Sequence, residues 1–69
     1  MTISIDELIS NPRKRFKARH SSESTVALTT GKKINFNKVS HHYRNIDYDG
    51  SLSAEETRQL FLATKLMGF

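Results

Sequence analysis

The sequence contains no cysteine, and it has only one proline and three glycines among 69 residues. Without cysteine the chain can form no disulfide, no thiolate zinc site and no thiol nucleophile. A metal ion would have to bind through oxygen or histidine ligands. Hydrophobic residues make up 36% of the chain, and a domain of this size buries only about 60% of its unfolded surface. We therefore expect one small domain, spanning residues 1–69.

Long hydrophobic segments are also absent. No apolar run approaches the roughly 18 residues that a membrane-spanning helix needs. The first ten residues carry acids before any base, unlike a secretory signal. A cysteine-free composition suits a reducing compartment. These features predict a soluble, cytoplasmic protein with no membrane partner.

Motifs typical of enzymes are missing as well. The chain has no glycine-rich phosphate loop and no Ser/His/Asp order typical of a hydrolase. His41 and His42 are adjacent, so on a helix they would diverge by about 100° and could not chelate one ion together. A chain this short rarely builds a pocket that excludes water. We therefore expect a protein that acts by binding and not by catalysis.

Charge is distributed unevenly along the chain. Residues 1–44 contain nine Lys/Arg and three Asp/Glu, a local net charge of +6, whereas residues 45–69 contain two and four, a local net charge of −2. A one-sided basic surface attracts anionic partners. The N-terminal part of the chain is thus the first place to look for a binding surface.

The sequence pattern predicts an α+β domain with a short N-terminal helix, a β-hairpin and two C-terminal helices. Ser4 and Glu7 form a capping-box pattern that predicts the first helix. Asn11 and Pro12 can start a second, short basic helix, within a basic segment and linker over residues 11–24. "SSES", residues 21–24, is typical of a linker.

Residues 25–36 alternate in polarity around Gly31, which predicts two short strands of a hairpin. Phe36, Val39, Tyr43 and Ile46 recur at spacings of three and four, which predicts a helix over about 37–45. Ser53 and Glu56 form a second capping-box pattern and predict a final helix that ends near Gly68.

The densest positive run is "PRKRFKARH", residues 12–20. Such a segment can neutralise phosphates and release counterions, while its aromatic residue can stack on a base. Nucleic acid, a nucleoprotein or an acidic protein surface would each suit it, and a solubilising tail is the alternative. The candidate residues are Arg13, Lys14, Arg15, Phe16, Lys17 and Arg19, with Lys32 and Lys33 at the hairpin tip.

A second candidate surface lies on the final helix. Phe61 points roughly opposite to Ala63 by the 100° rule, so it lies either in an all-round buried helix or on a docking surface for a protein partner. Phe69 is the other apolar candidate for such docking. A homo-oligomer is one form that this docking can take.

The stretch "NIDYDGSLSAEE", residues 45–56, raises a third hypothesis. Oxygen-bearing side chains stand at places one, three, five and twelve, and Gly50 stands at place six. This segment resembles the calcium-binding loop of the EF-hand family. The resemblance implies a Ca²⁺ site, with Asn45 at place one instead of the usual Asp. Its ligands would be Asn45, Asp47, Asp49, the backbone carbonyl of Ser51, and Glu56.

The same letters also spell a turn followed by a well-capped helix, since "DYDG" is a turn signal and "SAEE" a helix start. Taken together, the residues favour a small regulatory protein that docks on an anionic partner through its basic segment. A protein-interaction module or inhibitor, and a calcium-binding protein, are the alternatives. A short basic chain of this kind is as typical of a phage accessory protein as of a cellular one.

Overall fold

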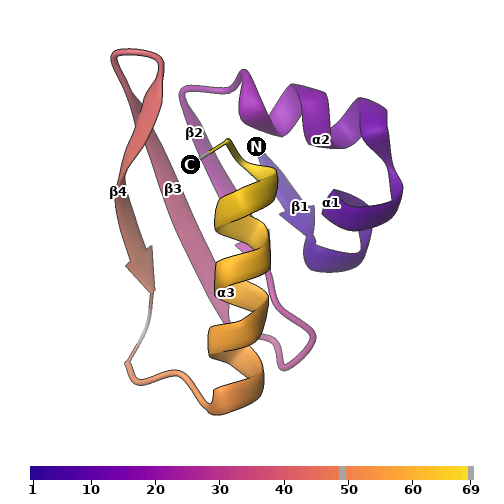
Figure 1. Ribbon diagram of the computed structural model, residues 1–69, viewed down its shortest axis with the longest axis vertical. Coiled ribbons are helices and arrows are strands. Elements are labelled where there is room, and N and C mark those ends of the chain that lie inside the picture. Colours follow the sequence, from indigo (N-terminus) through magenta and orange to yellow (C-terminus); the bar gives the residue numbers. More distant parts are fainter. Residues whose placement is uncertain (49, 69) are drawn as a thin grey trace.

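A four-stranded sheet with helices packed on one face forms the domain, so the expected α+β class is confirmed (Figure 1). The computed structural model describes residues 1–48 and 50–68. In chain order the elements are β1 (Thr2–Ser4), α1 (Ile5–Ser10), α2 (Pro12–Arg19), β2 (Glu23–Ala27), β3 (Lys33–Val39), β4 (His42–Tyr48) and α3 (Ala54–Leu66). Two of these elements were not predicted: β1, which precedes the first helix, and β4, which begins inside the segment predicted to be a helix.

The sheet has the strand order β1-β2-β3-β4. β1 is parallel to β2, with Ile3 opposite Val26, and α1 and α2 form the connection between them. β2, β3 and β4 follow one another as an antiparallel meander. β1 and β4 are therefore the two edge strands, and they lie on opposite sides of the sheet.

One face of the sheet carries the core. Ile34 and Phe36 on β3 are fully buried, whereas their neighbours Lys33, Asn35 and Asn37 are exposed. This alternation is typical of an antiparallel sheet with one face covered and the other in water. α3 crosses the covered face between β4 and α1 (Figure 1), and its Ala63 and Met67 belong to the core cluster.

The predicted helix over 37–45 is wrong, because this segment forms the end of β3, a turn and the start of β4. The register between β3 and β4 shifts at Asn37/Lys38: Asn37 pairs with Asn45, but Lys38 pairs with Tyr43. A β-bulge of this kind adds one residue to a strand and changes which residues face inward. Tyr43 and Ile46 thus both lie on the core face at a spacing of three, which resembles helical periodicity.

The helix starts, by contrast, follow the predicted caps. The Ser4 side chain accepts a hydrogen bond from the Glu7 amide at the start of α1. At the start of α3, the Ser53 hydroxyl accepts from the Glu56 amide at 3.3 Å, and the Glu56 carboxylate accepts from the Ser53 amide at 2.8 Å. The predicted linker is shorter than expected, because β2 already begins at Glu23.

Candidate nucleic-acid interface

The basic segment forms a helix that is held at its ends and not by an apolar face. The Asn11 side chain accepts a hydrogen bond from the Lys14 amide at 3.2 Å, and Pro12 takes the first helical position, where its missing N–H costs nothing. Only Ala18 of α2 is buried. The other side chains of α2 are therefore exposed or half-buried, and they can contact solvent, a ligand or neighbouring elements.

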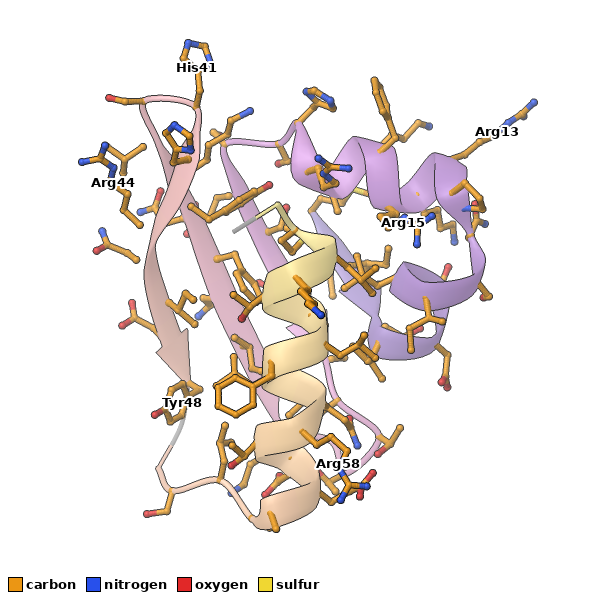
Figure 2. All side chains as sticks on the ribbon, in the orientation of Figure 1. Arg13, Arg15, His41, Arg44, Tyr48 and Arg58 are labelled. Carbon is orange, nitrogen blue, oxygen red and sulfur yellow. The ribbon has the colours of Figure 1, made fainter. Side chains whose placement is uncertain are left out.

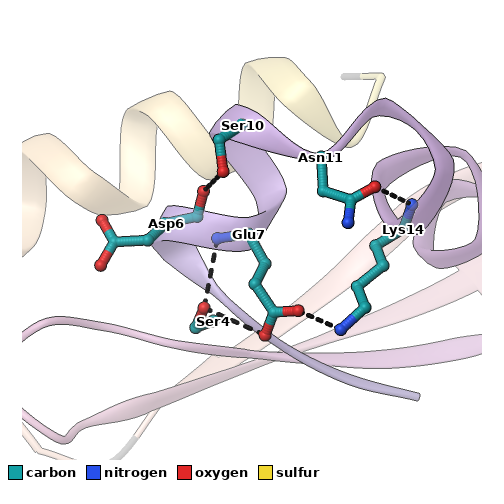
Figure 3. A network of polar contacts seen from close by, with 6 residues as sticks. All are labelled: Ser4, Asp6, Glu7, Ser10, Asn11 and Lys14. Carbon is teal, nitrogen blue, oxygen red and sulfur yellow. Dashed lines mark hydrogen bonds and ion pairs between the residues drawn. The ribbon is translucent and has the colours of Figure 1, made fainter.

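Two of the cations on α2 have polar partners within the fold, and a third packs beside Gly68. Lys14 forms an ion pair with Glu7, as Figure 3 shows, and the hydrogen bond from Lys14 lowers the pKa of the Glu7 carboxylate. Arg15 donates to the backbone carbonyl of Ile9 at 3.4 Å and lies between α2 and α1 (Figure 2). The Arg19 guanidinium packs beside Gly68, with Nη2 3.5 Å from where a Cβ would stand.

Three exposed side chains of α2 and its C-cap residue His20 form an outward stripe. Arg13, Phe16, Lys17 and His20 follow the i, i+3, i+4, i+7 spacing of one helix face, and all four are exposed. Arg13 points away from the molecule (Figure 2). Within residues 1–48 and 50–68, Arg13 and Lys17 make no ion pair and no side-chain hydrogen bond. We call these four residues the α2 stripe.

The α2 stripe combines an aromatic surface with positive charge. The Phe16 side chain is 62% exposed, and its ring centroid lies 4.2 Å from that of His20 with the planes tilted by 46°. A shallow hollow of about 410 Å³ is lined by Pro12, Arg13, Phe16 and Lys17. Its lining is largely apolar, and two of the four lining residues, Arg13 and Lys17, are cations. His20 and Pro12 were missed as site residues, although the i+7 spacing from Arg13 was a signal for His20.

The hairpin lysines do not extend this surface. Lys33 is exposed and pairs with Ala27, at the end of β2 farthest from α2. Lys32 donates to the Ser51 carbonyl and lies 3.4 Å from the Glu56 carboxylate. The two hairpin lysines thus lie the length of a strand away from α2. Of the two, Lys32 is paired with Glu56 within the fold.

The residues of the candidate calcium loop are arranged differently from a loop between two helices. Asn45 and Asp47 lie in β4, Ser51 follows that strand, and Asp49 lies outside the described residues. Among the residues that the structure describes, no group of three His, Cys, Asp or Glu side chains is placed to hold a metal ion. The calcium hypothesis therefore stays a prediction from the sequence.

Glu56, the closing residue of that loop, already has partners for its carboxylate. It is 4% exposed and accepts hydrogen bonds from the Thr30 hydroxyl at 2.6 Å and from the Ser53 amide. These bonds, the one from Thr30 above all, lower the pKa of Glu56 to about 2. The carboxylate joins the start of α3 to the loop between β2 and β3.

The apolar candidates on the C-terminal side are partly placed. Phe61 lies on α3 with 68% of its side chain exposed, which favours a docking residue over an all-round buried helix. Phe69 lies outside the described residues. The structure therefore describes this second candidate surface through Phe61.

Comparisons with known proteins add no assignment. The chain matches no protein-family model, no curated protein and no solved structure. Within the described residues, no helix has the length and apolar character needed to cross a bilayer. The functional argument thus depends on the surfaces of the molecule itself.

Proposed function

We propose that this is a nucleic-acid-binding protein that takes up single strands on the α2 stripe. The observation that carries the proposal is the 62% exposed Phe16 flanked by Arg13 and Lys17 on one helix face. Phenylalanine is among the residue types most often found buried. An exposed ring between two unpaired cations is the arrangement that proteins use to bind single-stranded nucleic acid.

The aromatic part of the stripe supplies a stacking surface. Base–aromatic stacking contributes about 1–3 kcal/mol per base and is tolerant of sequence, since every base has a π face. The hollow beside Phe16 is lined by Pro12 as well, so a flat base can contact two apolar side chains at once. We therefore expect binding with little preference among bases.

The charged part of the stripe supplies the salt-dependent component. Each phosphate that a cation neutralises contributes about 0.7 to the slope of log K against log salt for a single strand. Arg13 and Lys17 together should contribute about 1.4 to this slope. Lys14 and Arg15 should contribute less, because each already has a polar partner within the protein.

The test is a fluorescence-anisotropy titration of a labelled single-stranded oligonucleotide at several salt concentrations. The double variant Arg13→Gln/Lys17→Gln should bind more weakly and lose about 1.4 from the salt slope. Phe16→Ala should lower the affinity roughly fivefold or more with the slope unchanged. The matched control is Lys33→Gln/Arg58→Gln, which removes two charges from exposed residues away from α2. Lys33 pairs with Ala27 at the far end of β2, and Arg58 lies on α3 (Figure 2).

Two outcomes contradict the proposal. One is equal weakening by the control and by the α2 double variant, which would mean that only net charge matters. The other is displacement of the oligonucleotide by polyglutamate with no effect of Phe16→Ala, which would point to an acidic protein as the partner.

The 68% exposed Phe61 supports a second candidate function, protein docking through α3. Aromatic residues, phenylalanine among them, are enriched in protein–protein interfaces relative to the rest of the surface. Phe61→Ala should then weaken binding of that protein with little salt dependence. This function uses a different part of the surface from the α2 stripe.

A further inference from the structure

The turn between β3 and β4 projects from the sheet at the same end of the molecule as α2. β2 begins opposite Asn37, so the last pair of β3 and β4, Val39 with His42, lies beyond the start of β2. Figure 1 shows this hairpin end extending past β2, with α2 at the same end of the molecule. His41 and Arg13 both point away from the molecule there (Figure 2).

Hydrogen bonds hold the base of this hairpin against the end of α2. The Tyr43 hydroxyl donates to the Ala18 carbonyl. The Lys38 amide donates to the Ser22 carbonyl at 2.8 Å, and the Lys38 ammonium donates to the Arg19 carbonyl at 3.5 Å. These acceptors belong to the last turn of α2 and the residues that follow it. The hairpin is therefore fixed beside the C-terminal end of the α2 stripe.

The hairpin end carries positive and planar side chains. Residues 38–45, "KVSHHYRN", contain one lysine, one arginine and two histidines but no Asp or Glu. His41, His42 and Arg44 are exposed, and in the part of the chain that the structure describes they make no ion pair and no side-chain hydrogen bond. Bases of single strands stack on histidine rings and on arginine guanidinium planes. We call these three residues the hairpin cluster.

Several acidic side chains lie away from this end. Glu55 and Glu56 stand at the start of α3 and Asp47 near the end of β4, at the opposite end of the molecule (Figure 1). Glu23 lies at the base of the hairpin but on the sheet face away from the helices, because its neighbour Ser24 points toward α2 and donates to a carbonyl of that helix. The arrangement favours an anionic ligand that crosses this end on the side of α2.

The turn also has a backbone conformation that is costly for its residues. Ser40 and His41 have φ angles of 51° and 70°, in the left-handed region that disfavours residues with a Cβ. Asn-Gly is the typical sequence for a two-residue turn of this kind. A residue held in such a conformation is a candidate for a functional role, and the His41 ring is what an Asn-Gly turn would lack.

We propose that a single strand bound on the α2 stripe continues over the hairpin cluster, a contact that rests on the proposed function of α2 and extends it. Arg44 neutralises a phosphate, and His41 stacks on a base beyond the one on Phe16. The domain extends 24 Å along its second axis, which about seven nucleotides span at a stacked spacing of roughly 3.4 Å. Because the second contact is intramolecular, affinity increases with oligonucleotide length until both surfaces are filled.

The test is a fluorescence-anisotropy titration with labelled oligothymidylates of about four and about ten nucleotides, the shorter able to cover one surface and the longer both. Arg44→Gln should lower the salt slope for the longer strand by about 0.7, which corresponds to roughly fivefold in affinity at about 0.1 M salt. It should have less effect on the shorter strand. Lys33→Gln is the matched control, because it removes one exposed charge at the other end of β3 and should change neither affinity.

Ser40→Asn/His41→Gly separates binding from folding. It should melt at or above the wild-type temperature, because Asn-Gly suits the two positive φ angles. It should nevertheless bind the ten-nucleotide strand roughly threefold or more weakly, because the stacking ring is lost. A variant that is at least as stable as the wild type and binds more weakly cannot owe the loss to unfolding.

The outcomes distinguish this contact from the function of α2. Unchanged affinity in Arg44→Gln and in Ser40→Asn/His41→Gly, with Arg13→Gln/Lys17→Gln still weakened, would overturn the hairpin contact and leave the proposed function standing. Unchanged affinity in the α2 variants as well would mean that the proposed function is itself wrong. Equal weakening by Lys33→Gln and Arg44→Gln would also overturn the hairpin contact, because only net charge would then matter.

Discussion

The start of α3 gives the most direct test of whether residues 45–56 serve as a turn and a helix cap. Ser53→Ala removes the hydroxyl that accepts from the Glu56 amide, while the Glu56 carboxylate keeps its bonds from the Ser53 amide and from Thr30. Replacing an N-cap serine by alanine costs between about 0.5 and 2 kcal/mol. The lost bond is 3.3 Å long, and half of the capping box survives, so we expect about 1 kcal/mol.

In a domain of this length, 1 kcal/mol corresponds to a fall in melting temperature of roughly 4–8 °C. Thermal unfolding followed by circular dichroism, without calcium, measures it. Ser51→Ala is the matched control, because that serine contributes its backbone carbonyl and not its hydroxyl. Ser53→Asp keeps an acceptor at the cap and should stay within a few tenths of a kcal/mol of the wild type. Equal melting temperatures for Ser53→Ala and Ser51→Ala would refute the capping argument.

Four further predictions concern the same fold. The pKa of Glu56 is depressed in the folded state to about 2, so its contribution to stability is present above the unfolded value near 4.5 and lost as the pH falls toward 2. Urea unfolding at a series of pH values measures this loss. Glu56→Gln should make the free energy of unfolding less dependent on pH in this range. Tyr43→Phe removes the hydroxyl that donates to the Ala18 carbonyl and should cost about 1 kcal/mol in chemical unfolding. Replacing Ser40-His41 by Asn-Gly should stabilise the chain by about 1 kcal/mol or more in the same assay, because both residues have positive φ, at 51° and 70°. Excess calcium should leave the Gly50 amide resonance in place, since the Glu56 carboxylate is already hydrogen-bonded, and a large displacement with new order in 45–56 would instead support the EF-hand hypothesis.

Local capping signals predicted where the three helices begin. Ser4, Asn11 and Ser53 cap helices as their sequence contexts indicate, because a cap depends on residues three positions apart and on little else. The alternation around Gly31 also predicted the β2–β3 hairpin. These features depend on neighbours along the chain, which a single sequence displays directly.

The β3–β4 hairpin was missed for two physical reasons. Its turn is Ser40-His41, without the Asn or Gly that usually marks two positive φ angles, and the bulge at Arg44 converts the two-residue period of a strand into a spacing of three. β1 was missed because it has only three residues and exists through pairing with β2, more than twenty residues away.

The candidate residues were named from the sequence, but not their arrangement. Arg13, Phe16 and Lys17 form one exposed stripe, and the sequence could not indicate which cations the fold would pair. Lys14 is held by Glu7 and Lys32 by Glu56, and both pairings depend on how the elements pack. Counting charges along the basic segment thus overstates the charge that a partner can meet.

The single buried alanine of α2 has a consequence for local unfolding. Because the helix contributes little apolar area to the core, detaching it costs far less than opening β2 and β3, and segments with few buried contacts open as separate cooperative units. The amides of α2 should exchange with deuterium sooner than those of the central strands. A ligand that binds α2 would slow this exchange. The exchange rate of the α2 amides can therefore show whether a ligand is bound.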